Sequence, residues 1–136
     1  MLDPGVRELL DGANFVHLCT LMSDGSPHST VVWGATRGDQ ACFFTNNPAS
    51  LKGRNIARDP RISMSVVDRN NPYRSGFLRG RVVQTLSGDE VDAFVDEISK
   101  KFVGRPFPMR TNTLYLVDVD ASRCVDLPFE DKPAQE

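Results

Sequence analysis

The stretch FFTNNPASLKGRNIARDPR, residues 43–61, decides the fold, because it takes the chain from an apolar strand through a polar turn into a short helix. Phe43 and Phe44 lie at the end of the strand, and Pro60 marks where the helix must have stopped, since the residue before a proline avoids the helical conformation. A junction of this kind concentrates anion-binding chemistry at the start of the helix.

The helix start is predicted from the polar residues of the turn. Asn47 is expected to cap the helix, and Pro48 suits the first helical position, where its missing N–H would be unpaired anyway. The free N–H groups of the first turn and the positive end of the helix dipole favour a negative charge. Ser50 adds a hydroxyl group, and Lys52, in the second turn, adds a positive charge. We interpret residues 50–52 as a phosphate-binding corner, called the phosphate corner below.

Length and composition predict one soluble domain. The chain has 136 residues, 40% apolar and 25% charged, with a net charge of −2, so a broad basic face for nucleic acid is not expected. No apolar run approaches the ~18 residues of a membrane span, and no signal peptide opens the chain, so we expect a cytoplasmic protein. The domain core is expected at about residues 14–125, followed by a loose tail at 128–136.

The cysteines give no sign of a metal site or a disulfide. Cys19, Cys42 and Cys124 are far apart and form no CxxC pair, and their spacing with His17 and His28 fits no standard zinc pattern. We therefore expect no metal.

Apolar alternation and turn residues predict about six strands with two or three helices. The strands are expected at 15–22, 28–36, 41–45, 62–67, 76–85 and 113–125, with loops at 68–73 and 105–112. Gly80 marks a bulge. One helix follows Asp3, and another follows a capping box at residues 87–90 and buries the stripe Val91, Phe94, Val95, Ile98 and Phe102. Hairpin order favours a closed antiparallel barrel, because closure removes exposed edges.

Laid in order, the motifs resemble those of the pyridoxamine 5′-phosphate oxidase-like superfamily of split β-barrel flavoproteins. They are DGSPH at 24–28, FTN at 44–46, KGRN at 52–55, RDPR at 58–61 and GRV at 80–82. Within the superfamily the chain is most similar to the flavin/deazaflavin oxidoreductases of the B group, which use coenzyme F420. The resemblance implies a fold that is mainly β with α, a six- or seven-stranded antiparallel Greek-key barrel with two to four helices.

The resemblance also implies a site. The lysine that holds the cofactor phosphate is Lys52, with Ser50 and Leu51 before it, and Thr45 and Asn55 belong to the same wall. The second strand runs along the cofactor ring, which places Ser29, Thr30, Val31, Val32 and Trp33 beside it. The family forms homodimers with cofactor sites at the interface, and the candidates for contacts across that interface are Tyr73, Arg74 and Arg79.

One departure bears on the cofactor. FMN-using oxidases of the superfamily carry an Arg-Lys pair for the phosphate, whereas this chain has Leu51-Lys52, and lysine cannot replace a bidentate arginine. This favours F420 over FMN, with Arg54 or Arg58 as possible replacements. Arg58 also suits the longer anionic tail of a deazaflavin cofactor, or it is a solvated helix end.

No catalytic side-chain set is expected, because the cofactor supplies the chemistry. His28 and Tyr73 are the candidates for a polar or proton-donating role. Three functions remain open: an F420-dependent reductase acting on a small organic acceptor, an FMN-binding oxidase or flavin reductase, and a cofactor-binding protein without catalysis.

Overall fold

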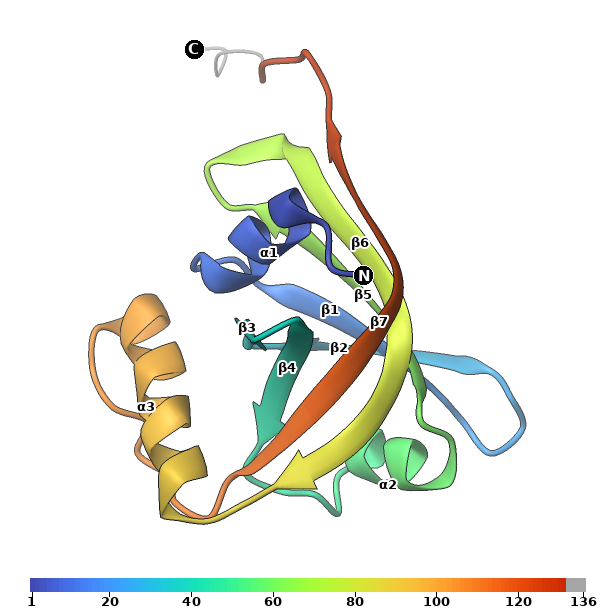
Figure 1. Cartoon of the computed structure of the whole chain (residues 1–136), viewed down its shortest axis with the longest axis vertical. Helices are drawn as coiled ribbons and strands as arrows, with labels where there is room; N and C mark the ends of the chain where they lie inside the picture. Colours follow the sequence, from blue (N-terminus) through green and yellow to red (C-terminus); the bar gives the residue numbers. More distant parts are fainter. Residues whose placement is uncertain (132–136) are drawn as a thin grey trace, which may run out of the picture.

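Seven antiparallel strands form one strongly curled sheet in the computed structural model, which describes residues 1–131 (Figure 1). Three helices accompany the sheet. In chain order the elements are α1 (Pro4–Asp11), β1 (Val16–Leu21), β2 (Pro27–Val32), β3 (Gly34–Arg37), β4 (Gln40–Thr45), α2 (Leu51–Arg58), β5 (Arg61–Asp68), β6 (Asn71–Leu86), α3 (Asp89–Val103) and β7 (Thr113–Asp126). The predicted fold class, mainly β with α in a split barrel, is confirmed.

The sheet is a split barrel whose edge strands are neighbours in sequence. The strand order is β2-β1-β5-β6-β7-β4-β3, so β2 and β3 are the two edges. The single strand expected at 28–36 is broken at Trp33, because Val32 packs inside the barrel whereas Trp33 stacks on Phe102 of α3, with ring centroids 4.8 Å apart. Among the described residues, no hydrogen-bonded ladder joins β2 to β3, so the predicted closure of the barrel is wrong. The two edge strands are connected only by the chain itself, at Trp33.

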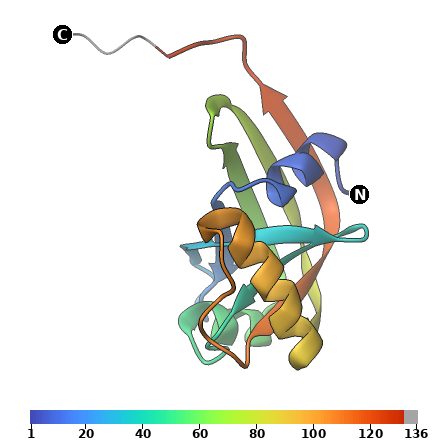
Figure 2. The same cartoon turned by 90° about the vertical axis from the view of Figure 1, so that its left-hand side faces the viewer.

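Two apolar clusters make up the core, one on each side of β4. Ala41 and Phe43 face the barrel interior, which α1 closes with Val6, Leu9 and Leu10. Cys42 and Phe44 pack with the buried residues of α3, the helix that lies across the sheet in Figure 2. A strand covered on both faces is apolar at every position, which explains the continuous run ACFF. Burial raises the pKa of the Cys42 thiol to about 12, so this cysteine is a neutral apolar residue.

Helix α3 confirms its predicted apolar stripe but not its predicted cap. Val91, Val95 and Ile98 are buried, with Phe94 and Phe102 packed against the same cluster. The helix begins at Asp89 and its N-cap is Gly88, at φ 110°, with no side-chain cap. The capping box is replaced by the acidic first turn Asp89, Glu90 and Asp92, whose charges complement the helix dipole.

Around β6, one prediction is confirmed and another is wrong. The register of β6 against β7 shifts between Arg79 and Gly80, as expected of a bulge, and a Cβ at Gly80 would lie 2.1 Å from the Asp118 carbonyl oxygen. The loop expected at 68–73 is instead a tight hairpin, since Asp68 pairs with Asn71 and β6 already begins there. Asn and Asp side chains favour such turns by bonding to nearby backbone N–H groups, as Asp68 does to the N–H of Asn70 (2.8 Å).

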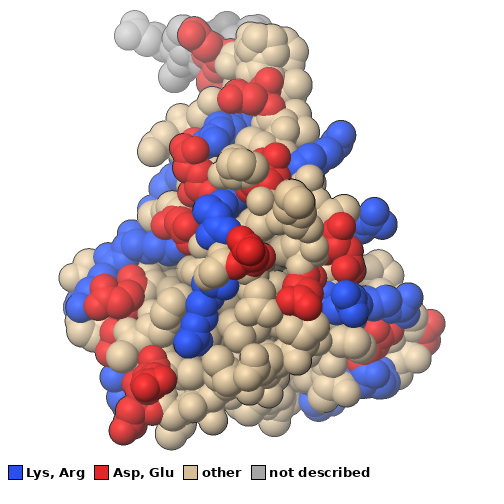
Figure 3. Space-filling model, in the orientation of Figure 1, with Lys and Arg blue, Asp and Glu red and all other residues tan. Residues whose placement is uncertain are grey.

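The surface carries charges of both signs. In Figure 3 they are interspersed over the upper part and flanks of the face shown, and the lower middle of that face is uncharged. No helix among residues 1–131 is long and apolar enough to cross a membrane. Of the predicted tail, residues 128–131 contain no helix or strand, and the rest lies outside the described residues. Phe129 packs edge-on against Tyr73, with centroids 5.7 Å apart.

Candidate functional site

The phosphate corner lies at the start of α2, which begins three residues later than expected. Ser50, not Asn47, is the N-cap, and Pro48 belongs to the preceding turn. The Asn47 side chain accepts a hydrogen bond from the Ala49 N–H (3.1 Å), and its carbonyl accepts one from the Ser50 N–H (3.0 Å). An Asn side chain that closes such a turn competes with helix formation. Lys52 therefore lies in the first turn of α2, at the positive end of the helix dipole.

Two groups in this corner lack partners among residues 1–131. The Ser50 hydroxyl oxygen is buried and makes no hydrogen bond, although Ser50 is the N-cap residue. Lys52 is half-buried, and burial alone lowers the pKa of its ammonium group. No carboxylate of the described residues forms an ion pair with it. An unsatisfied hydroxyl at the N-cap and a cation in the first turn without an ion-pair partner are groups that an anion at the start of the helix can satisfy.

Thr45 and Asn55 support the corner from within. The Thr45 hydroxyl accepts a hydrogen bond from the Asn47 N–H (3.1 Å) and so holds the turn. Asn55 is 1% exposed and donates to the Thr20 hydroxyl of β1 (3.0 Å). Both side chains are thus engaged inside the protein, where they fix α2 against the sheet.

The arginines of α2 point away from Lys52. At 100° per residue, Arg54 and Arg58 lie about 160° and 120° around the helix axis from Lys52. Arg54 is exposed. Arg58 donates to the Leu21 carbonyl (2.7 Å) and to the Asn55 side chain (3.0 Å), which ties α2 to the end of β1. Leu51, half-buried at the first helical position, supplies no charge to the corner.

Strand β2 divides its predicted ring-facing residues between two faces. Thr30 pairs with the buried Leu18 and so points into the barrel with Val32, whereas Val31 pairs with His17 and is 54% exposed on the outer face. Cross-strand partners share a face of the sheet. Ser29 lies on the outer face with Val31. Trp33, expected beside the ring, is part of the aromatic cluster against α3.

His28 of β2 is linked to α2 indirectly, through Thr20 of β1. It lies on the inner face, opposite Thr20, and Thr20 in turn bonds to Asn55 of α2. The His28 Nδ1 atom is buried and has no partner in the described part of the chain. The structure therefore brings His28, the inner face of β2 and α2 to one end of the barrel.

Tyr73 and Arg74 are engaged within the chain. The Tyr73 hydroxyl donates to Asp131 (2.7 Å), which raises the pKa of the phenol. Arg74 lies within ion-pair distance of three carboxylates: Glu8 at 3.4 Å, and Asp68 and Asp126 at 3.9 Å each. Neither side chain belongs to the phosphate corner.

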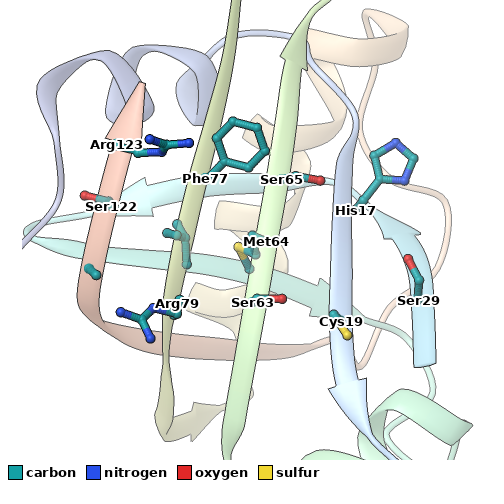
Figure 4. A pocket seen from close by; sticks show the side chains of 12 residues that line it. His17, Cys19, Ser29, Ser63, Met64, Ser65, Phe77, Arg79, Ser122 and Arg123 are labelled. Carbon is teal, nitrogen blue, oxygen red and sulfur yellow. The ribbon is translucent and has the colours of Figure 1, made fainter. Parts of the chain in front are cut away.

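Arg79 lies on a different feature, a shallow groove of about 670 Å³ across the outer face of the sheet (Figure 4). We call the outward side chains of this groove the outer sheet face; they are His17, Cys19, Ser29, Ser63, Ser65, Phe77, Arg79 and Arg123. In Figure 4 they form two rows, one from Arg123 to His17 and one from Arg79 to Ser29. No carboxylate among residues 1–131 pairs with Arg79. The groove combines small hydroxyl groups with one exposed phenyl ring.

Sequence reasoning singled out only Ser29 and Arg79 of the outer sheet face as site residues. The signal was present in the alternation of β1 and β5. His17 and Cys19 alternate with buried Val16 and Leu18, and Ser63 and Ser65 alternate with buried Ile62, Met64 and Val66. A strand that alternates small polar with apolar residues exposes the polar ones on one face.

Comparisons with known proteins agree with the fold. The model of the pyridoxamine 5′-phosphate oxidase family matches residues 2–123. A solved structure described as an F420 reductase is 28% identical, with a TM-score of 0.76, covering 90% of this chain and 98% of that one. A conserved hypothetical protein from Mycobacterium tuberculosis is 19% identical, with a TM-score of 0.77, covering 98% and 93% of the two chains.

More distant structures share the fold. A pyridoxamine 5′-phosphate oxidase-related, FMN binding protein from Nostoc punctiforme is 17% identical, with a TM-score of 0.61, covering 87% of this chain and 76% of that one. No curated protein matches the chain. Because the family model spans nearly the whole barrel, the chain belongs to the pyridoxamine 5′-phosphate oxidase family.

Proposed function

We propose that the protein is an F420-dependent reductase that transfers a hydride between the deazaflavin cofactor and a small organic acceptor. The observation that carries the proposal is the phosphate corner, where the buried Ser50 hydroxyl and the Lys52 ammonium group have no partner among residues 1–131. A phosphate group fits this donor set, because it offers acceptors for the hydroxyl group and a charge for the lysine.

The choice of F420 over FMN rests on the absence of a second cation at the corner. Leu51 precedes Lys52, Arg54 points to solvent on the far side of α2, and Arg58 is bound to the Leu21 carbonyl. None of these residues supplies a bidentate clamp beside Lys52. The similarity to an F420 reductase over 90% of the chain supports the same choice.

The cofactor supplies the hydride, and the protein supplies position and a proton. Ser50 and Lys52 would hold the phosphate, and β2 would run beside the ring with Ser29 and Val31, the residues on its exposed face. His28 lies on the same strand and has a buried Nδ1 atom without a partner among residues 1–131, whereas the Tyr73 hydroxyl is committed to Asp131. We therefore assign the proton-donating role to His28 rather than Tyr73.

The proposal includes a homodimer formed through the outer sheet face. Phe77 in the groove is 41% exposed, and Val31, next to the groove on the same side of the sheet, is 54% exposed. An apolar patch with a polar surround is typical of an interaction surface. A second copy of the chain would bring Arg79, which has no ion-pair partner among residues 1–131, to the interface.

Fluorescence titrations of the protein with F420 and with FMN test the proposal. We expect micromolar or tighter binding to F420 and weak binding to FMN. Lys52→Ala should weaken F420 binding tenfold or more, which corresponds to about 1.4 kcal/mol or more, as expected for a charged hydrogen-bond partner. Lys100→Ala is the matched control, because Lys100 is an exposed lysine paired with Glu97 on α3.

The other outcomes of these titrations would favour a different function or remove Lys52 from the site. Tighter binding of FMN would favour the oxidase or flavin reductase function, which the family name also supports. F420 binding without turnover of any acceptor would favour a cofactor-binding protein. Equal F420 affinity in the wild type and Lys52→Ala would remove Lys52 from the site.

A further inference from the structure

A second cavity lies on the opposite side of the aromatic cluster from the barrel interior. It has a volume of about 540 Å³, within the range of small-molecule sites. Its lining comes from Trp33, from the C-terminal half of α3 and from the loop after it: Ser99, Val103, Arg105, Pro106, Phe107 and Pro108. Figure 2 shows this loop running back along α3 toward the sheet. We call it the α3 cavity.

The α3 cavity is apolar except for two groups. Five of its seven lining residues are apolar, and two of these, Trp33 and Phe107, are aromatic, with rings 6.1 Å apart. Ser99 is 0% exposed, and its hydroxyl oxygen has no hydrogen-bond partner among residues 1–131. Arg105 is exposed and forms no ion pair with a described carboxylate. The cavity thus has an unsatisfied hydroxyl at its buried end and a free cation at its rim.

The loop that closes the α3 cavity is held in place. The Phe107 N–H donates to Asp96 of α3 (3.1 Å), and Arg110 donates to the same carboxylate (2.6 Å). One turn earlier in α3, Asp92 accepts from the N–H of Asn112 (3.0 Å). Pro106 and Pro108, one on each side of Phe107, restrict the backbone further. Because the walls are fixed before any ligand binds, little ordering cost opposes binding.

We propose that the α3 cavity binds a small aromatic carboxylate that carries a polar group opposite its carboxylate. The ring would pack among Trp33, Val103 and Phe107, the carboxylate would pair with Arg105, and the distal polar group would satisfy the Ser99 hydroxyl. A buried polar group without a partner costs free energy in the empty protein, so a ligand that satisfies it gains that amount on binding. This site is separate from the phosphate corner and does not depend on the cofactor.

Three probes separate the contributions of the two polar residues. They are 4-hydroxybenzoate, benzoate, which lacks the distal hydroxyl, and methyl 4-hydroxybenzoate, which lacks the charge. Trp33 is the only tryptophan of the chain, so its indole N–H resonance in the 15N-labelled protein reports on the cavity directly. We expect a saturable shift of this resonance with 4-hydroxybenzoate, and weaker binding of the other two probes.

The variants give the decisive comparison. Ser99→Ala should weaken 4-hydroxybenzoate about fivefold and leave benzoate unchanged, while the thermal stability is kept or raised because an unsatisfied hydroxyl is removed. Arg105→Gln should weaken 4-hydroxybenzoate at least fivefold and leave the methyl ester unchanged. Arg54→Gln, at an exposed arginine on the solvent side of α2, should change neither. The absence of a saturable shift up to the solubility limit, or equal affinities of all probes in all variants, would overturn the proposal.

Discussion

At the scale of single residues, the geometry of the phosphate corner depends on Gly53. A Cβ atom at this position would lie 2.1 Å from the Pro48 carbonyl oxygen and 2.8 Å from the Pro48 carbonyl carbon. The turn at Pro48 therefore packs directly on the backbone of α2, and this contact holds the turn before Ser50 against the first turn of the helix. A side chain on residue 53 would separate the turn from the helix.

Gly53→Ala should therefore destabilise the protein, although glycine to alanine in a helix interior normally stabilises by about 0.5–1 kcal/mol. We expect a net loss of about 1–3 kcal/mol, as for other overpacked sites, and weaker F420 binding. Thermal unfolding followed by circular dichroism measures the first effect and the F420 titration the second. Arg54→Ala, on the solvent side of the same helix, is the control and should change stability by less than about 0.5 kcal/mol. A more stable Gly53→Ala protein would contradict the close packing at Pro48.

The phosphate corner also shows what residue patterns can predict. The residue types Ser50 and Lys52 at a helix start predict an anion site, and this site stays a prediction. The start of the helix was misplaced because Asn47 serves equally well as a cap and as a turn former, and only its hydrogen bond to the Ala49 N–H decides between them. The burial of Asn55 and the second role of Arg58 depend on β1, which lies 34 or more residues away and leaves no local signal.

At the scale of elements, α3 is fastened to the barrel by one lysine. The Lys101 Nζ atom donates to the carbonyls of Leu10 (2.8 Å) and Gly34 (2.7 Å), so it joins α3 to the end of α1 and the start of β3. The side chain is half-buried, and burial lowers the pKa of its ammonium group. No local pattern in the sequence marks this role of Lys101, because its two acceptors are distant in the chain.

Lys101→Met should keep the apolar stem and leave two carbonyl groups without their donor. We expect a loss of about 1–3 kcal/mol in the free energy of unfolding, the usual cost of stranding partly buried acceptors. Urea unfolding followed by circular dichroism measures it. The neighbouring Lys100→Met removes only an exposed pair with Glu97 and should cost less than about 1 kcal/mol. Equal effects of the two substitutions would show that Lys101 does not fasten α3.

At the scale of the whole molecule, hairpin order and turn residues were enough to predict an antiparallel barrel, and the family resemblance implied its split form. Most strands were placed within a few residues, because β1, β4, β5 and β7 carry strong apolar patterns. The predicted closure of the barrel was wrong. The break at Trp33 arises because Val32 and Trp33 pack into different apolar clusters, and membership of a cluster is a property of the folded chain rather than of a local pattern.

The proposed dimer is tested at the centre of the outer sheet face. Phe77→Asp places a charge where the partner copy would pack, so light scattering after size exclusion should show a monomer for this variant and a dimer for the wild type. Val83→Asp is the matched control, since Val83 lies on the same strand, is 46% exposed and is outside the groove. Because the cofactor site is proposed to lie at the interface, the Phe77→Asp monomer should also bind F420 at least tenfold more weakly. A dimer that survives Phe77→Asp would move the interface elsewhere. A monomer with full affinity for F420 would show that one chain alone completes the site.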